Sequence, residues 1–180
     1  LKEGTINLGT KHICPEIGQA EIIFICTPVS SIPYMLSQIA PLISPNAIVT
    51  DTGSTKQEIV EAAQRILKGR ANFIGGHPMA GTQNSGYRAS LPHLFENAYY
   101  VLTPLPETSD NAVNALSNLL EAIGAIPLIM DAKLHDEIVC SISHLPHVVA
   151  AALVNTVRSM EDPEHFRVRL AAGGFRDITR

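Results

Sequence analysis

One histidine stands in a segment rich in glycine and proline, residues 75–81, which reads GGHPMAG. The preceding run 71–74 is typical of a β-strand. Glycine and proline hold a backbone in a tight path and leave room for a ligand beside the imidazole of His77. Because ligands of open α/β sheets bind beyond the carboxyl ends of the strands, the pattern predicts His77 in a turn at such an edge. A solvated loop histidine would show the same local pattern.

Two further strand ends carry polar residues. The apolar run 21–26 ends at Thr27-Pro28-Val29, and the next apolar run ends at residues 51–56, which read DTGSTK. The second of these ends also precedes a helical pattern, and the free N–H groups at a helix start favour an anion or a hydroxyl. We expect both ends at the same ligand edge of the sheet. The alternative is that Ser54 or Thr55 only caps the helix.

Two other groups of residues could bind a ligand. His144 and His147 are three positions apart, so both imidazoles lie on one face of a helix. A zinc pair is conceivable, but no third ligand is identifiable from the spacing. A buried pair satisfied by the neighbouring backbone is another interpretation. Near the end of the chain, Arg176 and Arg180 follow a glycine-rich turn at Gly173 and could hold a carboxylate in a bidentate pair.

The elements that must position these residues alternate between short apolar runs and helical patterns, which predicts an α/β fold with parallel strands and helical crossovers. We expect strands over 21–26, 47–50, 71–74, 97–103 and 126–130 and helices over about 32–39, 56–67 and 111–123. From residue 131 to about 157 a single long helix is predicted, with His135 at one of its periodic positions and a kink at Pro146. The change of pattern predicts two domains, 1–130 and 131–180.

The amino-acid composition of the chain argues against some classes of function. The chain has 180 residues, 46% of them hydrophobic, and a net charge of −4. These values give no basic stripe for nucleic acid, and we find no apolar run that approaches a membrane span. Cys14, Cys26 and Cys140 fit no metal-binding spacing, so we expect small core residues and a reducing cytoplasm. Because the chain starts at a leucine and ends straight after a glycine-rich turn, we expect a fragment cut at both ends.

Five segments together resemble the prephenate and arogenate dehydrogenases of tyrosine biosynthesis. They are 48–56 (IVTDTGSTK), 73–82 (FIGGHPMAGT), 94–104 (LFENAYYVLTP), 142–147 (ISHLPH) and 173–177 (GGFRD). Short motifs mislead singly, but five at compatible spacing seldom arise by chance. The resemblance extends over nearly the whole chain.

The resemblance implies a mostly parallel, Rossmann-like NAD(P)-binding domain, followed by an all-helical domain that forms a homodimer. The implied reaction is the oxidative decarboxylation of prephenate to 4-hydroxyphenylpyruvate, with arogenate as the alternative substrate. The sequence contains no GxGxxG turn and no acidic residue following one, so the first βαβ unit of the nucleotide site is missing. The residues that would distinguish NAD from NADP are thus not in this sequence. The resemblance implies either cofactor, with a slight preference for NAD.

By the same resemblance, His77 takes the proton of the substrate hydroxyl, Ser54 hydrogen-bonds to that hydroxyl or to the imidazole, and Arg180 pairs with the ring carboxylate. The other substrate-binding positions implied are Thr82, Ser143, His144, His147 and Gly173. The cofactor-binding positions implied are Thr27, Pro28, Val29, Asp51, Gly53 and Ser54. No metal is implied.

Two functions of other classes remain open. A catalytically silent fragment would bind the substrate or tyrosine as a regulatory or oligomerisation module, and the missing glycine loop favours it. A metal-dependent hydrolase would use His77, His144 and His147, and only the number of histidines favours it. We expect no nucleic acid or membrane partner for either.

Overall fold

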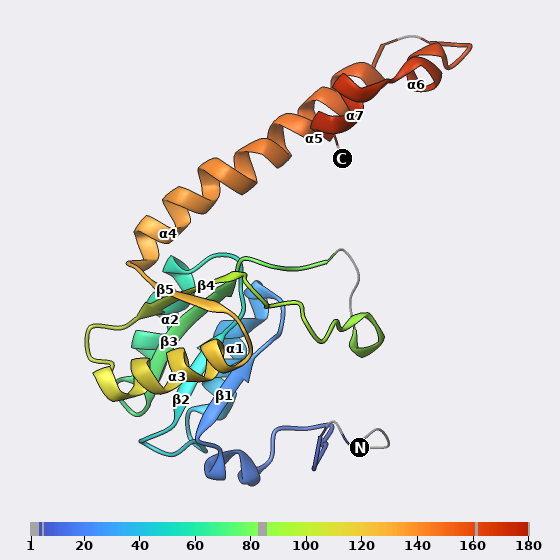
Figure 1. Ribbon diagram of the computed structural model, residues 1–180. Helices are drawn as coiled ribbons and strands as arrows, with labels where there is room; N and C mark the ends of the chain where they lie inside the picture. Colours follow the sequence, from blue (N-terminus) through green and yellow to red (C-terminus); the bar gives the residue numbers. More distant parts are fainter. Residues whose placement is uncertain (1–3, 5, 83–85, 161, 180) are drawn as a thin grey trace. The chain divides into compact units, whose positions relative to one another are not determined.

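The computed structural model describes residues 4, 6–82, 86–160 and 162–179 (Figure 1). The chain divides into two compact units, Leu1–His135 and Asp136–Arg180. The first contains a β-sheet with its helices, and the second is helical.

The first unit is built on a five-stranded sheet in the order β1-β2-β3-β4-β5. Its strands are β1 (Ile22–Ile25), β2 (Ile48–Asp51), β3 (Asn72–Pro78), β4 (Tyr99–Pro104) and β5 (Ile126–Ile129). The β1–β2, β2–β3 and β4–β5 pairs are parallel, which confirms the mostly parallel sheet. The β3–β4 pair is antiparallel, which a mostly parallel sheet allows, although the sequence did not indicate which pair of strands it would be.

The connection between β3 and β4 explains why these two strands are antiparallel. A parallel pair needs a crossover connection, usually an α-helix. Between β3 and β4, the described residues contain only one short 3₁₀ helix, η3 (Tyr87–Ala89). The chain therefore returns beside β3 in the opposite direction.

Helices cover both faces of the sheet. The helices α1 (Ile32–Ile39) and α2 (Gln57–Leu67) lie on one face, and α3 (Asp110–Ala122) lies on the other (Figure 1). Each face has its own buried cluster: Leu36, Ile59 and Phe73 belong to the first, and Leu102 and Leu116 to the second. The predicted strands and helices are confirmed to within a few residues, except for the end of β3.

Two short 3₁₀ helices lie at opposite ends of β1. One, η1 (Pro15–Gln19), precedes the strand, and the other, η2 (Val29–Ser31), follows it and leads into α1. Because β1, β2 and β3 run parallel, their carboxyl ends lie at one edge of the sheet. The residues that follow β1 and β2 and the last residues of β3 share this edge, which we call the carboxyl edge.

A long helix begins at the end of the first unit and continues into the second. It consists of α4 (Ala132–Val139), a π-helical turn η4 (Cys140–His144) and α5 (Leu145–Arg158), and the short helices α6 (Phe166–Leu170) and α7 (Gly173–Thr179) follow. The long helix was predicted, together with a kink at Pro146. The structure has the π turn directly before Pro146, where the missing N–H of proline disturbs the ordinary helical hydrogen bonds.

The helix Ala132–Arg158 is long and apolar enough to cross a membrane, judged by length and composition alone. The statement that no apolar run approaches a membrane span is therefore wrong, because the long helix through Pro146 contains an apolar stretch of that length. One such helix is weak evidence for a membrane protein.

The cysteines also differ from the prediction. Cys26 and Cys140 are exposed, and Cys14 is partly buried. The prediction that they are small core residues is wrong: Cys26 follows the last residue of β1, and Cys140 lies in a helix from which few side chains are buried.

Candidate functional site

The candidate site is centred on the end of β3. This strand continues through both glycines to Pro78, and His77 pairs with Val101 of β4. The prediction that His77 lies in a turn is wrong, because the antiparallel pairing with β4 extends the strand over these residues. The predicted location at the carboxyl edge does hold, and the imidazole is half-buried there.

The glycines before His77 allow the neighbouring strands to approach. A Cβ atom on Gly75 would lie 2.3 Å from Oγ1 of Thr103 in β4. A Cβ atom on Gly76 would lie 2.4 Å from the backbone oxygen of Asp51 in β2. A backbone oxygen within a sheet has little freedom to move, so Gly76 accepts no side chain without displacement of a strand.

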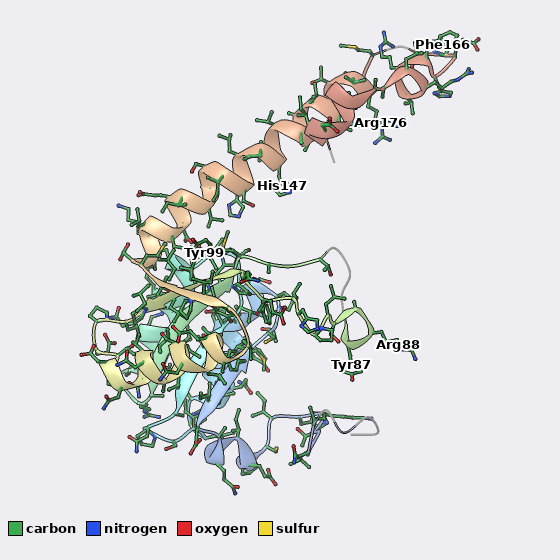
Figure 2. The ribbon with its side chains drawn as sticks, in the orientation of Figure 1. Tyr87, Arg88, Tyr99, His147, Phe166 and Arg176 are labelled. Carbon is green, nitrogen blue, oxygen red and sulfur yellow. The ribbon has the colours of Figure 1, made fainter. Side chains whose placement is uncertain are left out.

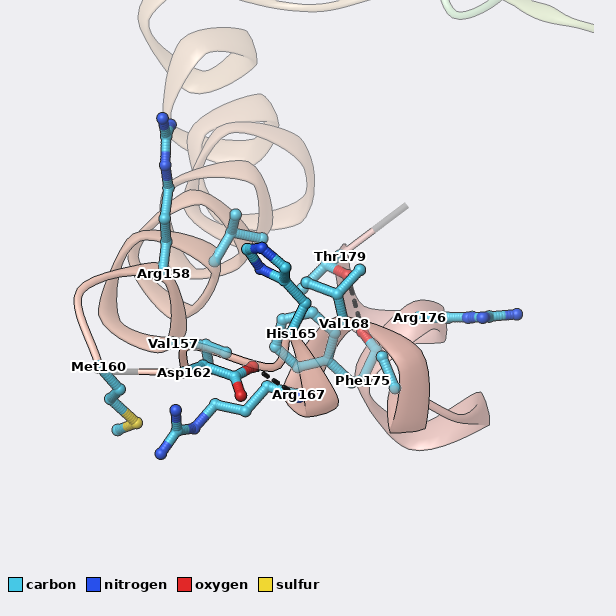
Figure 3. A pocket seen from close by; sticks show the side chains of 12 residues that line it. Val157, Arg158, Met160, Asp162, His165, Arg167, Val168, Phe175, Arg176 and Thr179 are labelled. Carbon is cyan, nitrogen blue, oxygen red and sulfur yellow. Dashed lines mark hydrogen bonds between the residues drawn. The ribbon is translucent and has the colours of Figure 1, made fainter.

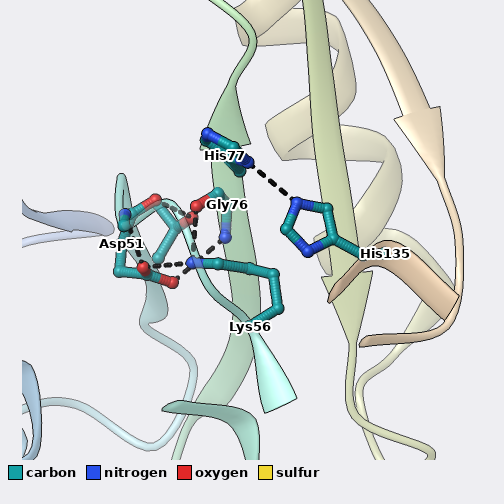
Figure 4. Close-up of polar contacts among 7 residues, drawn as sticks. Asp51, Lys56, Gly76, His77 and His135 are labelled. Carbon is teal, nitrogen blue, oxygen red and sulfur yellow. Dashed lines mark hydrogen bonds and ion pairs between the residues drawn. The ribbon is translucent and has the colours of Figure 1, made fainter. Parts of the chain in front are cut away.

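A buried ion pair holds the backbone next to His77 (Figure 4). The ammonium group of Lys56 contacts Oδ2 of Asp51, and both side chains are fully buried. Nζ of Lys56 also donates to the carbonyl oxygen of Gly76 at 2.7 Å, and Oδ1 of Asp51 accepts from the N–H of Gly76 at 3.1 Å. The pair therefore binds both polar groups of the residue that precedes His77.

The Asp51 carboxylate has a further partner in its own loop, the N–H of Gly53 at 2.8 Å. Burial raises the pKa of this carboxyl, and the Lys56 ammonium with the two backbone N–H groups opposes that rise. The carboxylate faces the protein interior, which differs from the direct cofactor contact expected for Asp51. Sequence reasoning missed the buried Lys56, since a lysine at a helix start normally faces solvent.

His135 is a second residue that sequence reasoning missed as part of the site. Its Nε2 lies 2.8 Å from Nδ1 of His77, and the two rings meet edge-on at 76° (Figure 4). His135 lies in the first turns of α4 and is only 1% exposed. Its place in the periodic pattern of a helix was the available signal, because apolar residues normally occupy the buried positions of such a pattern.

The start of α4 fixes where His135 lies. Oδ1 of Asp131 accepts hydrogen bonds from the backbone N–H groups of Lys133 at 2.9 Å and Leu134 at 3.0 Å. The backbone N–H of His135 donates to the carbonyl oxygen of Asp131 at 2.9 Å. The aspartate thus satisfies the free donors of the first helical turn and sets the register of the helix.

The loops after β1 and β2 meet at the carboxyl edge. A Cβ atom on Gly53 would lie 3.1 Å from a methyl group of Val29, so these loops are in close contact. Oγ1 of Thr27 is buried and has no hydrogen-bond partner among the residues that the structure describes. Pro28 and Ser54 are exposed. A buried hydroxyl without a partner at a ligand edge fits a site for the polar group of a cofactor.

The capping alternative for the loop after β2 is wrong. Lys56 is the N-cap residue of α2, and no side chain forms a capping hydrogen bond there. Ser54 lies two residues before the cap, with its side chain exposed. Ser54 and Thr55 are therefore not needed to complete this helix.

The remaining predicted residues belong to other segments of the chain. Thr82 is exposed after β3, and Gly173 is exposed at the start of α7. His144 ends the π turn, whereas His147 projects from α5 with its Nδ1 2.8 Å from the carbonyl oxygen of Ser143 (Figure 2). His147 is exposed, so the buried interpretation of this histidine is wrong.

Arg180 lies outside the described residues. In the described part of the chain, no group of three or more His, Cys, Asp or Glu side chains is arranged to hold a metal ion. The arrangement therefore offers no support for the metal-dependent hydrolase.

The helical unit contains a cavity of about 650 Å³, bounded by the end of α5, by α6 and by α7 (Figure 3). Val157, His165 and Phe175 line it, and the guanidinium groups of Arg158 and Arg176 point away from it. Among the residues that the structure describes, the predicted substrate-binding ones are not part of this lining.

Comparison with known proteins identifies the family. The family model for the nucleotide-binding domain of prephenate dehydrogenase matches residues 3–128, and the model for the dimerization domain matches residues 131–180. The chain belongs to the prephenate dehydrogenase family. The resemblance found in the sequence is thereby confirmed.

Individual relatives agree with this family. The chain is 42% identical to prephenate dehydrogenase of Bacillus subtilis over 100% of the chain and 49% of the relative. The crystal structure of arogenate dehydrogenase from Synechocystis has a TM-score of 0.82 at 40% identity and covers 92% of this chain and 59% of its own. That of prephenate dehydrogenase from Aquifex aeolicus, in complex with hydroxyphenyl propionate and NAD+, has a TM-score of 0.89 at 34% identity and covers 99% of this chain and 62% of its own.

The chain spans about half the length of the curated prephenate dehydrogenases of Bacillus subtilis and Lactococcus lactis that it matches.

Proposed function

We propose that this chain carries the site for NAD(P)-dependent oxidative decarboxylation of prephenate to 4-hydroxyphenylpyruvate. The observation that carries the proposal is the placement of His77 at the carboxyl edge of a family-typical sheet, with its ring held by His135. The family membership and the relatives named above supply the reaction class.

The reaction requires a proton acceptor on the protein. A hydride leaves the ring carbon that bears the hydroxyl group, and the hydroxyl proton must leave as that carbon becomes a carbonyl. The bond to the ring carboxylate then breaks, carbon dioxide departs, and the electron pair of that bond makes the ring aromatic. The carbonyl oxygen becomes a phenolate, which takes a proton back to give the phenol of 4-hydroxyphenylpyruvate. A half-buried imidazole at the edge of the sheet suits the proton transfer, so we assign that role to His77.

The remaining substrate contacts follow from the resemblance. Ser54 is exposed at the same edge and is proposed to hydrogen-bond to the substrate hydroxyl or to the imidazole. Arg180 is proposed to pair with the ring carboxylate. The other proposed substrate-binding positions are Thr82, Ser143, His144, His147 and Gly173.

A nicotinamide cofactor fits the carboxyl edge. When bound, NAD or NADP supplies the hydride acceptor. Thr27, Pro28 and Val29 would hold it together with the backbone of Gly53, and the buried hydroxyl of Thr27 would gain the partner that it lacks among the described residues. The preference between NAD and NADP stays a prediction, as does the cytoplasmic location.

We further propose that the helical unit forms a homodimer, in keeping with the match to a dimerization domain. Exposed apolar residues along α5, including Leu145, Val148 and Val149, offer such a surface. The domain boundary near residue 131 stays a prediction.

The test is NAD(P)H formation by the purified chain, with prephenate and arogenate each offered with NAD and NADP. Turnover with prephenate is the expected result. Turnover with arogenate alone would support the second substrate, which the similarity to an arogenate dehydrogenase favours. A folded sample that is silent in all four pairings would contradict catalysis by this chain and favour the substrate-binding fragment.

His77→Asn is the decisive variant. Loss of the proton acceptor should lower kcat by about 10²- to 10⁴-fold while the Michaelis constant changes little. His93→Asn is a matched control, because His93 is an exposed histidine whose imidazole contacts the nearby Glu96. Full turnover in the His77 variant would overturn the assignment of the base.

A further inference from the structure

We propose that His135 is a positioning residue that accepts a hydrogen bond from Nδ1–H of His77 and thereby holds His77 in the tautomer whose Nε2 can take a proton. The proposal rests on the function proposed for His77. It states which of the two rings, one from β3 and one from α4, donates the hydrogen bond and what that hydrogen bond does.

The geometry requires that one ring donates. Nδ1 of His77 and Nε2 of His135 are 2.8 Å apart, which is a hydrogen-bond distance. In a neutral imidazole one nitrogen carries the proton and the other accepts, so two neutral histidines in contact have two tautomer combinations. Either His77 donates from Nδ1, or His135 donates from Nε2.

The proposed chemistry selects the first combination. A proton acceptor needs an unprotonated nitrogen toward the substrate, and His135 occupies the side of Nδ1. The other ring nitrogen, Nε2, must then be the basic one, so the proton of the neutral His77 ring must sit on Nδ1. Nδ1–H requires an acceptor, and Nε2 of His135 is in position to be one.

The surroundings make His135 suitable for this task. Its ring is almost completely buried, so water does not compete for the contact. Its backbone is fixed in the first turns of α4 by the hydrogen bonds to Asp131. The buried Asp51–Lys56 pair holds the other partner, because it binds the backbone of Gly76 directly before His77. The backbone at or next to each histidine is thus held by its own set of hydrogen bonds.

The two roles stay distinct during the reaction. When Nε2 of His77 takes the hydroxyl proton, the ring becomes an imidazolium that still donates from Nδ1 to His135. His135 neither gains nor loses a proton. A group that orients an imidazole in this way commonly changes turnover more than substrate binding.

The first experiment measures the tautomer directly and needs neither substrate nor cofactor. Long-range ¹H–¹⁵N spectra of the chain give the protonation of each ring nitrogen, and loss of signals in His77→Asn identifies those of His77. We expect Nδ1 protonated and Nε2 unprotonated above the pH at which the ring is charged. In His135→Leu we expect a shift toward the Nε2–H tautomer. Protonated Nε2 in the unaltered chain, or an unchanged tautomer in His135→Leu, would overturn the proposal.

The second experiment separates positioning from folding. His135→Leu should lower kcat by about 10- to 100-fold with little change in the Michaelis constant. His135→Gln, whose amide oxygen can accept the same hydrogen bond, should regain part of that loss. Val113→Ala in α3 is the control, since it removes buried volume from the opposite face of the sheet.

Equal losses of kcat in His135→Leu and His135→Gln would contradict the proposal, as would a loss in Val113→Ala as large as that in His135→Leu. If the unaltered chain shows no turnover, the function proposed for it fails, whereas the tautomer measurement still decides the direction of the hydrogen bond.

Discussion

Two regions of this chain carry pairs of histidines, and they are built in different ways. His77 and His135 come from a strand and a helix far apart in sequence, and a buried hydrogen-bond network holds the backbone of the residue before His77. His144 and His147 lie on successive turns of one helix, where Nδ1 of His147 contacts only the backbone oxygen of Ser143 among the contacts that are resolved. The first pair is fixed by tertiary structure, and the second by local helical geometry.

The difference shows which part of the proposed site is held in a fixed orientation. A general base must be held in one orientation, which requires contacts from several elements. Residues that contribute only binding contacts can lie exposed on a helix. If this contrast holds, substitutions around His77 should cost both folding and turnover, whereas substitutions near His147 should leave folding unchanged.

The largest effect on stability is expected for Lys56→Met. Removing the cation leaves the Asp51 carboxylate buried without its partner, which should lower the free energy of unfolding by about 3–5 kcal/mol. Urea unfolding measures it, with the exposed Lys133→Met as the control. Adding Asp51→Asn should restore part of the loss, because no uncompensated charge remains. A loss no larger than that of Lys133→Met would contradict the buried network.

The same variant should respond to pH in a defined direction. Burial already raises the pKa of Asp51, and loss of the ammonium raises it further. A carboxyl whose pKa is higher in the folded than in the unfolded state loses stability as pH rises through the folded value. The deficit of Lys56→Met relative to the unaltered chain should therefore shrink as pH falls. A deficit that grows on acidification would show that Asp51 is not the group left unpaired.

A smaller effect is expected for Gly76→Ala. The added methyl group would lie 2.4 Å from the backbone oxygen of Asp51 and must push β2 and β3 apart. Overpacking of this kind costs about 1–3 kcal/mol of unfolding free energy. Gly81→Ala is the matched control from the same glycine-rich segment, since its Cβ would meet no atom of the described residues within 4 Å. Equal stability of the two variants would mean that the strands adjust freely.

The smallest effect is expected for His147→Gln. The side chain is exposed and its resolved hydrogen bond is local, so the unfolding free energy should change by no more than about 0.5 kcal/mol. Thermal unfolding of this variant beside Lys56→Met tests the contrast directly. A loss comparable with that of Lys56→Met would show that the helical histidines are also held by tertiary contacts.

Local sequence was sufficient to predict most elements. Runs such as Ile22–Ile25 and Ile48–Asp51 are rich in β-branched residues and are followed within three residues by proline or glycine, so their boundaries could be predicted. The direction of β4 was not predicted, because pairing direction depends on the connection and not on the strand itself. Its signal was the lack of a helical pattern between β3 and β4.

The site was predicted in part for a related reason. His77 stood out because glycine and proline surround it, whereas Lys56 carries no local mark of burial and His135 carries only its place in the helical period. Each is held in part by a partner distant in sequence, the backbone of Gly76 for Lys56 and the ring of His77 for His135. A polar residue at a periodic apolar position of a helix is the one sequence signal that would have pointed to His135.

The absence of side chains at Gly75 and Gly76 also has an evolutionary consequence. The stem of Lys56 and the hydroxyl of Thr103 lie where a side chain at Gly75 would be, and the ring of Tyr100 lies close to the corresponding place at Gly76. A change at one of these positions therefore alters what the others can accept, so their mutational effects should not add. Related sequences that change one of these residues should therefore change the others as well. We expect the sequence of β3 to vary more slowly than that of β2 or β4.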